Sequence, residues 1–233
     1  MSAEPARPGR PDGRPLLLAC ALGAEQAALR AGVRAAPSVR LIRTGMGGEK
    51  ALRSVSSALA QEEYPPGAFL FAGFGAAVGP GIRPGDVLVA TEVRDASSGA
   101  GGAGDGGADG RVGGVTGLPC PDALAAALRS VGLTVHTGPL FSADAVVRGD
   151  RRAELHAAGV LAVDMETAGA LRALPAGLPA AAVRVVVDTP EHELLRPGTL
   201  VHGLRAWRAL RTAAPVLAAF GSPFSERALV TSS

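Results

Sequence analysis

Val183-Arg184-Val185-Val186-Val187-Asp188 is a short apolar run, interrupted by one arginine, that ends in a carboxylate just before Thr189-Pro190. Runs that are apolar on both faces are typical of strands in a sheet covered on both sides. Similar runs recur along the chain, separated by segments of helical composition, at residues 16–21, 39–43, 69–72, 87–90, 133–140 and 160–163. The sequence therefore predicts an α/β fold, a three-layer αβα sandwich with helices on both faces of the sheet.

The helices expected between these strands cover residues 25–31, 49–60, 122–131, 165–173 and 201–219, with one more from Asp150. With 233 residues, 47% of them hydrophobic, the chain can bury one sizeable core, and we predict a single domain over residues 15–220. Three segments are rich in Gly, Pro or small polar residues and are expected to be flexible: a leader (1–14), an insertion (96–114) and a tail (221–233).

Composition excludes several classes of protein. A net charge of +2 and 3% aromatic residues give neither the basic field nor the stacking surface that nucleic-acid binding needs. No segment is long and apolar enough to span a membrane, and the apolar stretch before Cys20 is too short for an export signal. Cys20 and Cys120 have no CxxC spacing and the four histidines have no metal-ligand spacing. We therefore expect a cytoplasmic protein without a metal site.

Three acidic positions come directly after predicted strands. They are Glu25 after the first strand, Asp164 with Glu166 after the run 160–163, and Asp188 at the end of the run from Val183. Ligands of open α/β sheets bind outside the carboxyl ends of the strands, so side chains at such positions converge whatever their separation in sequence. Each carboxylate alone has a simpler interpretation, as the start of a helix or a turn. Together they predict a ligand site at one edge of the sheet.

Five segments point to one family: 163–168 (Val-Asp-Met-Glu-Thr-Ala), 183–188, 71–75 (Phe-Ala-Gly-Phe-Gly), 85–89 (Gly-Asp-Val-Leu-Val) and 18–25 (Leu-Ala-Cys-Ala-Leu-Gly-Ala-Glu). Together they resemble signatures of the nucleoside phosphorylase/nucleosidase superfamily, including the methylthioadenosine/S-adenosylhomocysteine nucleosidases. The resemblance spans about residues 16–195. It implies a phosphorylase/hydrolase-like fold around a central mixed sheet, and a homodimer.

The resemblance also implies an activity, cleavage of the N-glycosidic bond of a purine nucleoside or 5′-modified adenosine, with release of the free base and no cofactor. Asp188 would hold or donate the proton at N7 of the leaving purine, and a positioned general acid typically contributes about 10²–10⁴-fold. Glu25 would orient and deprotonate the attacking water, with Arg184 nearby. The small-molecule nucleoside and a co-substrate, water or phosphate, are the expected partners.

Recognition of the sugar is implied in the same way. Glu166 would accept hydrogen bonds from the ribose 2′- and 3′-hydroxyls, with Met165 against the sugar. A carboxylate below the ring also stabilises the positive charge of an oxocarbenium-like transition state. The backbone of Gly73, Phe74 and Gly75 would face the base and the sugar.

Two positions depart from the nucleosidase pattern. The aromatic residue that stacks on the base is replaced by Val146, so stacking is expected from Phe74 or Phe141. The residue before Asp188 is Val187 where the nucleosidases usually have a serine. The segment from Val183 also resembles the hopanoid-associated phosphorylase group, and the two valines suit an apolar substrate of the adenosylhopane type.

Two alternatives remain open. Phosphorolysis needs a phosphate site, and residues 22–26 (Leu-Gly-Ala-Glu-Gln) lack the proline and arginine of the Gly-Asp-Pro-x-Arg phosphate segment found in hexameric phosphorylases. A glutamate there repels a phosphate dianion, which favours water, although Arg43, Arg83 or Arg184 could form a phosphate clamp. The other alternative is a non-catalytic nucleoside-binding protein, for which buried carboxylates without a task would be costly.

Overall fold

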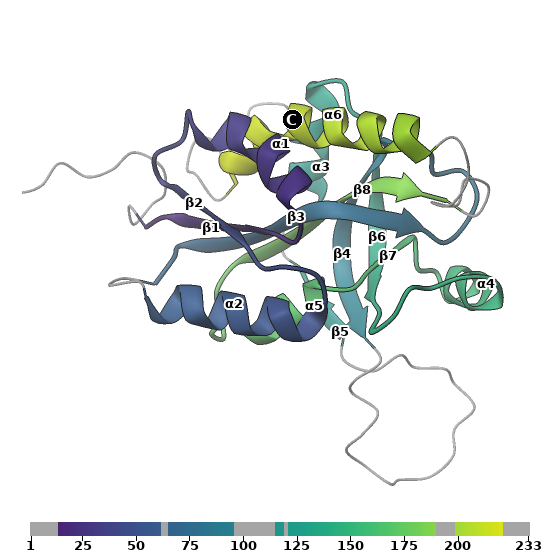
Figure 1. The fold of residues 1–233 in the computed structure, drawn as a ribbon, viewed down its shortest axis with the longest axis horizontal. Coiled ribbons are helices and arrows are strands. Elements are labelled where there is room, and N and C mark those ends of the chain that lie inside the picture. The colour runs from purple at the N-terminus through teal and green to yellow at the C-terminus, as the bar shows by residue number, and fades with distance from the viewer. Residues whose placement is uncertain (1–13, 62–64, 96–114, 119–120, 190–198, 221–233) are drawn as a thin grey trace, which may run out of the picture.

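The computed structural model describes residues 14–61, 65–95, 115–118, 121–189 and 199–220. Strands and helices alternate along most of the chain, which confirms the predicted α/β class (Figure 1). The elements are β1 (Leu16–Cys20), α1 (Gly23–Val33), β2 (Val39–Arg43), α2 (Gly48–Ala60), β3 (Ala68–Ala77), β4 (Val87–Asp95), β5 (Val115–Gly117), α3 (Pro121–Ser130), β6 (Val135–Ser142), α4 (Asp150–Ala157), β7 (Ala162–Asp164), α5 (Thr167–Arg172), β8 (Ala180–Asp188) and α6 (Thr199–Ala218).

The strands of the described residues form one mixed sheet of eight strands, in the order β2-β1-β3-β7-β6-β4-β5, with β8 paired to both β3 and β4. The pairs β3–β7, β4–β5 and β4–β8 are antiparallel, and the others are parallel. Part of the sheet closes on itself. In this part each strand pairs with the next in the order β3, β7, β6, β4, β8, and β8 pairs with β3 again. The predicted mixed sheet is thus confirmed, and its closure is a feature that the sequence did not predict.

Helices cover both faces of the sheet, as predicted: α1, α3 and α6 lie on one face, and α2 and α5 on the other (Figure 1). The reason is visible in β1, all of whose residues are buried. Leu16, Leu18 and Cys20 pack into the core under the first set of helices. Leu17 and Ala19 pack into the core under the second set. Successive side chains of a strand point to opposite faces, so an unbroken apolar run requires cover on both.

Two glycines allow helices to approach each other closely. A Cβ on Gly32 of α1 would lie 2.3 Å from the carbonyl of Ala214 in α6. A Cβ on Gly169 of α5 would lie 2.1 Å from the carbonyl oxygen of Gly48 at the start of α2. Neither position accepts a larger residue without moving backbone. The second contact brings the start of α2 against the segment that carries Glu166.

Three sequence predictions need correction. The helix expected from Met165 begins at Thr167, because Glu166 adopts a non-helical conformation at the N-cap position. The glycines Gly73 and Gly75, expected where a strand ends, lie inside β3, which continues to Ala77. The short strand β5 was not predicted at all.

Several predictions fall on residues that the structure does not describe. The insertion (96–114) and the tail (221–233), both predicted to be flexible, lie outside the described residues, as do Cys120 and all of the leader except Arg14. Within the described part of the chain, no helix is long and apolar enough to cross a membrane.

Candidate active site

Glu25 is buried in the first turn of α1, just after the end of β1. Its Oε2 accepts hydrogen bonds from the backbone amides of Ala21 (2.8 Å) and Leu22 (2.7 Å), and its Oε1 accepts one from the amide of Phe74 (2.6 Å). Burial raises the pKa of this carboxyl, while the nearby charge of Arg184 and the three amides lower it in part. Glu25 is therefore held in one orientation and retains more basicity than an exposed glutamate.

Arg184 extends from the middle of β8 and is 1% exposed. Its Nε donates to Oδ2 of Asp164 at 2.7 Å, and its Nη2 donates both to Asp164 and to Oγ1 of Thr167. The guanidinium carbon lies 4.4 Å from the centre of the Phe71 ring. Asp164 also accepts hydrogen bonds from Ser142 and Thr167. The contacts with Asp164, Thr167 and Phe71 therefore hold the guanidinium of Arg184 in one position.

Gly73 is the point at which Glu25 and Arg184 meet. A Cβ at this position would lie 2.6 Å from Oε1 of Glu25 and 3.0 Å from Nη1 of Arg184. The absence of a side chain at residue 73 thus allows a carboxylate from α1 and a guanidinium from β8 to approach the same stretch of β3. Three of the predicted site residues, Gly73, Glu25 and Arg184, therefore lie next to one another in the structure.

Glu166 lies between β7 and α5 and is 8% exposed. Its Oε1 accepts a hydrogen bond from the backbone amide of Gly47 (2.9 Å), and its Oε2 accepts one from the amide of Met165 (3.2 Å). The contact with Gly47 links this carboxylate to the turn before α2, a contact that no sequence pattern predicts. Met46, next to that glycine, is an exposed apolar side chain.

Asp188 is the last residue of β8 and is 5% exposed. Its partner in the sheet is Ala76 of β3, which also pairs with Val163 of β7, so the ends of β7 and β8 flank the same residue of β3. Its Oδ2 accepts a hydrogen bond from Nη2 of Arg152 at 2.5 Å. Arg152, in the first turn of α4, is equally buried and also donates from Nε to the carbonyl oxygen of Val147 (3.1 Å).

Arg152 was not predicted as a site residue. It follows another arginine in a polar helix, a pattern that is typical of a solvated surface, so the sequence contains no signal for its burial. Ser142 was not predicted as a site residue either. Its hydroxyl accepts a hydrogen bond from the amide of Ala168 and donates one to Asp164. The burial and hydrogen bonds of these two side chains depend on which elements pack together in the fold, and local sequence does not predict this.

Negative charge is in excess among these buried side chains. Two carboxylates have an arginine partner, Asp164 with Arg184 and Asp188 with Arg152. Glu25 and Glu166 form no ion pair with any described residue, and their hydrogen bonds come from backbone amides. A low-dielectric region with unbalanced carboxylates favours a ligand, or a transition state, that carries positive charge.

The remaining predicted residues differ in how accessible they are. Val146 is 62% exposed and is available for contact with a ligand. Phe74 is partly buried against the core under α1 and α6. Phe141 is 3% exposed and packs in a separate cluster with Val147, so its ring does not present a free face for stacking on a base.

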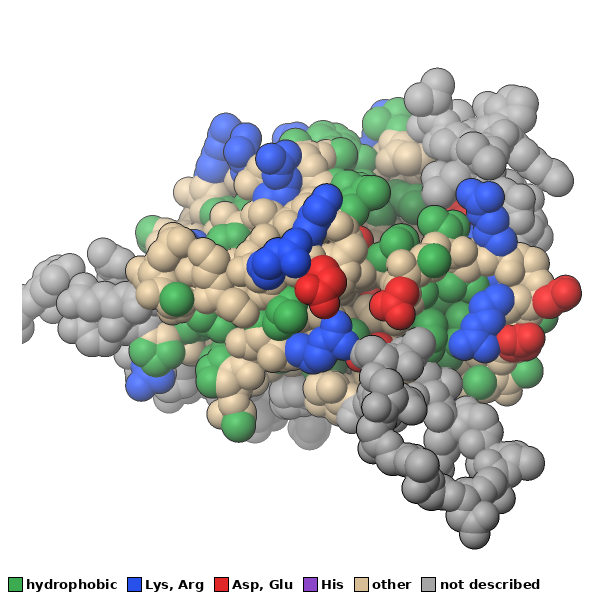
Figure 2. Space-filling view, turned by 60° about the horizontal axis from the view of Figure 1, so that its bottom comes forward, with side chains coloured by type: hydrophobic (Ala, Val, Ile, Leu, Met, Phe, Trp, Pro, Cys, Tyr) green, Lys and Arg blue, Asp and Glu red, His purple; other side chains and the backbone are tan. Residues whose placement is uncertain are grey.

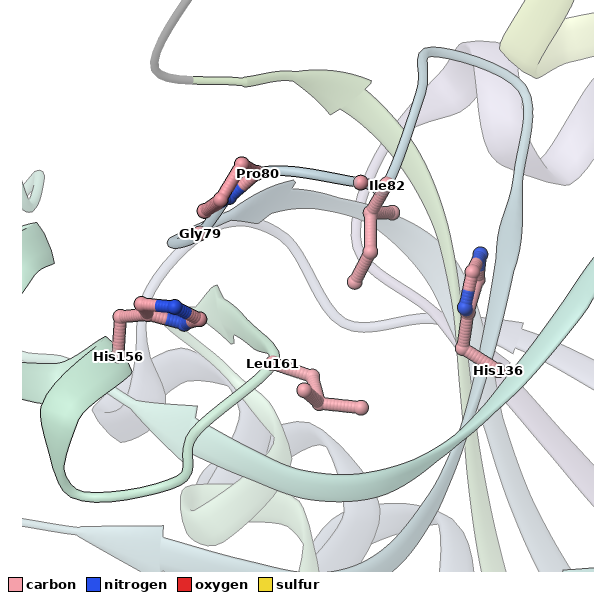
Figure 3. Close-up of a pocket in the computed structure, with 7 residues that line it drawn as sticks. Gly79, Pro80, Ile82, His136, His156 and Leu161 are labelled. Carbon is pink, nitrogen blue, oxygen red and sulfur yellow. The ribbon is translucent and has the colours of Figure 1, made fainter.

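A pocket of about 240 Å³ is lined by none of the predicted site residues. Figure 3 shows His156 and His136 on opposite sides of it, with Ile82 and Leu161 between them. Nε2 of His136 lies 3.0 Å from Oδ2 of Asp86. His156 is on α4, one helical turn after Arg152, so the pocket and the Arg152–Asp188 pair share this helix.

Charges of both signs are mixed on the face that Figure 2 shows. On the face in Figure 2, acidic side chains lie near the middle, with basic and apolar side chains around them. A face of mixed charge does not produce the field of one sign that attracts nucleic acid. Among the residues that the structure describes, no group of three or more His, Cys, Asp or Glu side chains could hold a metal ion.

The chain is an α/β protein with buried carboxylates at or just after the ends of its strands. The family model of the Phosphorylase superfamily matches residues 26–218, and the chain belongs to this superfamily. The match begins one residue after Glu25. No curated protein matches the sequence of the chain.

Solved structures of nucleosidases have the same fold. The 5′-methylthioadenosine/S-adenosylhomocysteine nucleosidase from Neisseria meningitidis, in complex with methylthio-immucillin-A, has a TM-score of 0.72 at 18% identity, covering 88% of this chain and 99% of its own. The S-adenosylhomocysteine nucleosidase from Streptococcus pyogenes has a TM-score of 0.66 at 20% identity, covering 87% and 96%. The nucleosidase from Colwellia psychrerythraea, in complex with adenine, has a TM-score of 0.68 at 19% identity, covering 89% and 95%. At these identities the similarity concerns the fold.

Proposed function

We propose that the chain is an enzyme that hydrolyses the N-glycosidic bond of a purine nucleoside, an adenosine modified at its 5′ position, and releases free adenine. The observation that carries the proposal is the placement of Glu25, a buried carboxylate oriented by three amides beside Arg184, in a member of the Phosphorylase superfamily. Similarity to nucleosidases whose structures contain adenine or methylthio-immucillin-A supports adenine as the base.

The excess of buried carboxylates supports this reaction class. Cleavage of an N-glycosidic bond passes through an oxocarbenium-like sugar, and the positive charge that develops there is stabilised by Glu25 and Glu166, which have no cationic partner of their own among the described residues. Asp188 faces the edge of the purine that carries N7 and stabilises the base as it leaves.

Water is the better nucleophile for this site. A phosphate dianion beside Glu25 meets a like charge in a buried environment. Of the three arginines that could offset it, Arg184 is already bound to Asp164 and Thr167, and Arg43 and Arg83 are exposed. Phosphorolysis of the same bond is the alternative that the product assay in the Discussion tests.

Exposed apolar side chains support a substituent at the 5′ position. Met46 is 59% exposed and adjoins the glycine whose amide binds Glu166, the proposed ribose ligand. Val146 is 62% exposed on the loop before α4. An apolar group attached to the sugar would cover such side chains, as a methylthio group or a longer chain of the adenosylhopane type would.

The test is a panel of nucleosides assayed for free base: adenosine, 5′-methylthioadenosine, inosine and uridine. We expect adenine release, fastest from a 5′-modified adenosine, and none of uracil. Tight binding of adenosine without release of base would instead identify a non-catalytic nucleoside-binding protein.

We expect Glu166→Ala to weaken recognition of the ribose hydroxyls. The wild type should prefer a nucleoside over its 2′-deoxy analogue by about tenfold or more, since hydrogen bonds to a charged group contribute about 1.5–3 kcal/mol. The variant should lose most of this preference, as measured by the ratio of kcat/KM values. The exposed Glu49→Ala in α2 is the control. A ratio that Glu166→Ala leaves unchanged removes Glu166 from the sugar site.

The raised pKa of Glu25 predicts the acid side of the pH profile. A general base works in its ionised form, so kcat/KM should fall as pH decreases through this pKa, which burial places above the ordinary value of 4.5. The loss should approach tenfold per pH unit, as expected for one proton. The same limb should be absent from the residual activity of Glu25→Gln. A wild-type profile that stays flat down to pH 4.5 contradicts the role of Glu25.

A further inference from the structure

The outward side of α6 carries three arginines and no acidic side chain. Arg205, Arg208 and Arg211 follow one another at intervals of three residues, which places them on one side of the helix, and all three are exposed. The 20 residues of α6 contain no Asp or Glu. None of the three arginines forms an ion pair with a described residue. Their charges therefore face solvent without compensation.

Exposed arginines on other helices are arranged differently. In α2, Arg53 lies 3.4 Å from Glu49, and in α4, Arg151 lies 2.8 Å from Glu154. Opposite charges at spacings of three or four residues stabilise a helix, whereas like charges at these spacings repel. The row of arginines on α6 is therefore unfavourable in water, and it becomes favourable when a negatively charged surface lies against it.

The helices beside α6 extend its positive charge. The helices α1 and α3 lie on the same side of the sheet and both contact α6 (Figure 1). Arg30 in α1 donates to Gln26, and Arg129 in α3 donates to the carbonyl oxygen of Val135, so neither charge is neutralised. The exposed charged side chains of α1, α3 and α6 are thus five arginines and one acid, Asp122. In a chain with a net charge of +2, this is a marked concentration.

Apolar side chains lie among these charges. Leu204 is 46% exposed, and Trp207 is partly buried against the core. The indole Nε1 of Trp207 donates to the carbonyl oxygen of Ala24 at 3.2 Å, and the guanidinium carbon of Arg211 lies 5.4 Å from the centre of its ring. Arginines together with Trp and Leu on one helix are typical of helices that bind the headgroup region of a bilayer.

We propose that the outward sides of α1, α3 and α6 form a surface that binds the headgroups of an anionic lipid bilayer. This basic surface consists of Arg30, Arg129, Arg205, Arg208, Arg211 and Leu204. The opposite side of α6, which includes Ala206, Leu210 and Leu217, stays in the core, so the protein docks on the bilayer in its folded form. The surface is independent of the reaction proposed for the candidate active site.

The arrangement of the basic surface favours a bilayer over a nucleic acid. A helix that reads duplex DNA enters the major groove, whereas α6 lies packed between the sheet and the neighbouring helices α1 and α3. Single strands bind to rows of stacking aromatic rings, and α6 has one such ring, that of Trp207, partly buried. A bilayer requires positive charge spread over a broad side of the protein and an apolar side chain, such as Leu204, that enters the headgroup region.

Trp207 makes binding directly measurable. It is the single tryptophan of the chain, so energy transfer from it to a dansyl-labelled lipid reports binding of the protein to a vesicle. At about 0.1 M salt, where the Debye length is about 10 Å, we expect transfer to vesicles of phosphatidylcholine and phosphatidylglycerol and none to phosphatidylcholine alone. At about 1 M salt, where the Debye length is about 3 Å, transfer should be lost. Absence of binding to the phosphatidylglycerol vesicles at the lower salt contradicts the proposal.

The decisive variant replaces three arginines of α6 by glutamine: Arg205→Gln, Arg208→Gln and Arg211→Gln. Its affinity for the anionic vesicles should fall by about 100-fold, at about fivefold for each arginine. Co-sedimentation measures this affinity, because Arg211 contacts the Trp207 ring and its loss changes the fluorescence. All three side chains are exposed, so the variant should melt as the wild type does.

The matched control removes three exposed arginines outside α1, α3 and α6: Arg53→Gln, Arg148→Gln and Arg151→Gln. It has the same net charge as the α6 variant, and its affinity for the vesicles should stay within about threefold of the wild type. Equal affinities of the two triple variants would show that net charge alone drives the binding, and would overturn the assignment to the basic surface.

Leu204→Ser separates a bilayer from other polyanions. The variant keeps every charge, so binding of duplex DNA through these arginines would not change. Its affinity for the anionic vesicles should fall by about three- to tenfold, because a half-exposed leucine no longer enters the headgroup region. A wild type that binds duplex DNA at about 0.1 M salt and does not bind the vesicles would assign the basic surface to nucleic acid and overturn the proposal.

Discussion

Asp188→Asn should lower kcat by about 10²–10⁴-fold, the range typical for loss of a group that assists a leaving group. The amide has nearly the same shape as the carboxylate, but it carries no charge to hold Arg152 and cannot stabilise a protonated base. Since these interactions strengthen as the bond breaks, the loss should fall on kcat more than on KM. Single-turnover measurement of adenine release gives the value directly.

Two controls separate this effect from unfolding. Asp188 and Arg152 are both buried, and removal of one charge from a buried pair is destabilising, so the melting temperature of the variant must be measured with its activity. Asp122→Asn, at the exposed start of α3, removes one negative charge that belongs to neither partner of the pair and should keep wild-type activity. A cooperatively melting Asp188→Asn with wild-type kcat contradicts the assigned role.

Gly73→Ala should reduce kcat/KM by about 100-fold or more, although it adds only one methyl group. The Cβ would lie 2.6 Å from Oε1 of Glu25 and 3.0 Å from Nη1 of Arg184, and both groups are held by hydrogen bonds that restrict their retreat. A displacement of the general base by about 1 Å is enough for a loss of this size.

The matched control is Gly203→Ala in α6, where a Cβ meets no other atom within 4 Å. Alanine is favoured over glycine inside a helix, so this variant should be as stable as the wild type or slightly more so, with unchanged activity. Full activity of Gly73→Ala would show that Glu25 and Arg184 do not have to meet at this glycine during the reaction.

The layers of the fold could be predicted because they follow from local pattern. The run from Leu16 to Cys20 is apolar at every position, and the structure buries its alternate residues in the two cores above and below the sheet. The closure of the sheet could not be predicted in this way. It depends on β8 pairing with β3 and with β4, a long-range choice that the apolar pattern of residues 183–187 does not encode.

For the candidate site, the sequence pointed to the carboxylates but did not show which groups bind them. Glu25, Glu166 and Asp188 are recognisable because acidic residues after apolar strands are unusual and match a family signature. Their partners are backbone amides, such as that of Gly47, or polar side chains such as Arg152, and neither leaves a pattern in the sequence. The start of α5 was placed two residues early for a related reason, since Glu166 forms its hydrogen bonds with Gly47 and Met165 from a non-helical N-cap position.

The identity of the sugar product distinguishes hydrolysis from phosphorolysis. The enzyme is incubated with 5′-methylthioadenosine in phosphate-free buffer and again with phosphate, and the sugar is identified by mass spectrometry. Hydrolysis activated by Glu25 predicts the free reducing sugar at the same rate in both buffers, with one oxygen from solvent when the water is labelled with ¹⁸O. A rate that vanishes without phosphate, and a sugar 1-phosphate when phosphate is restored, would contradict the account of Glu25 as the base that activates water.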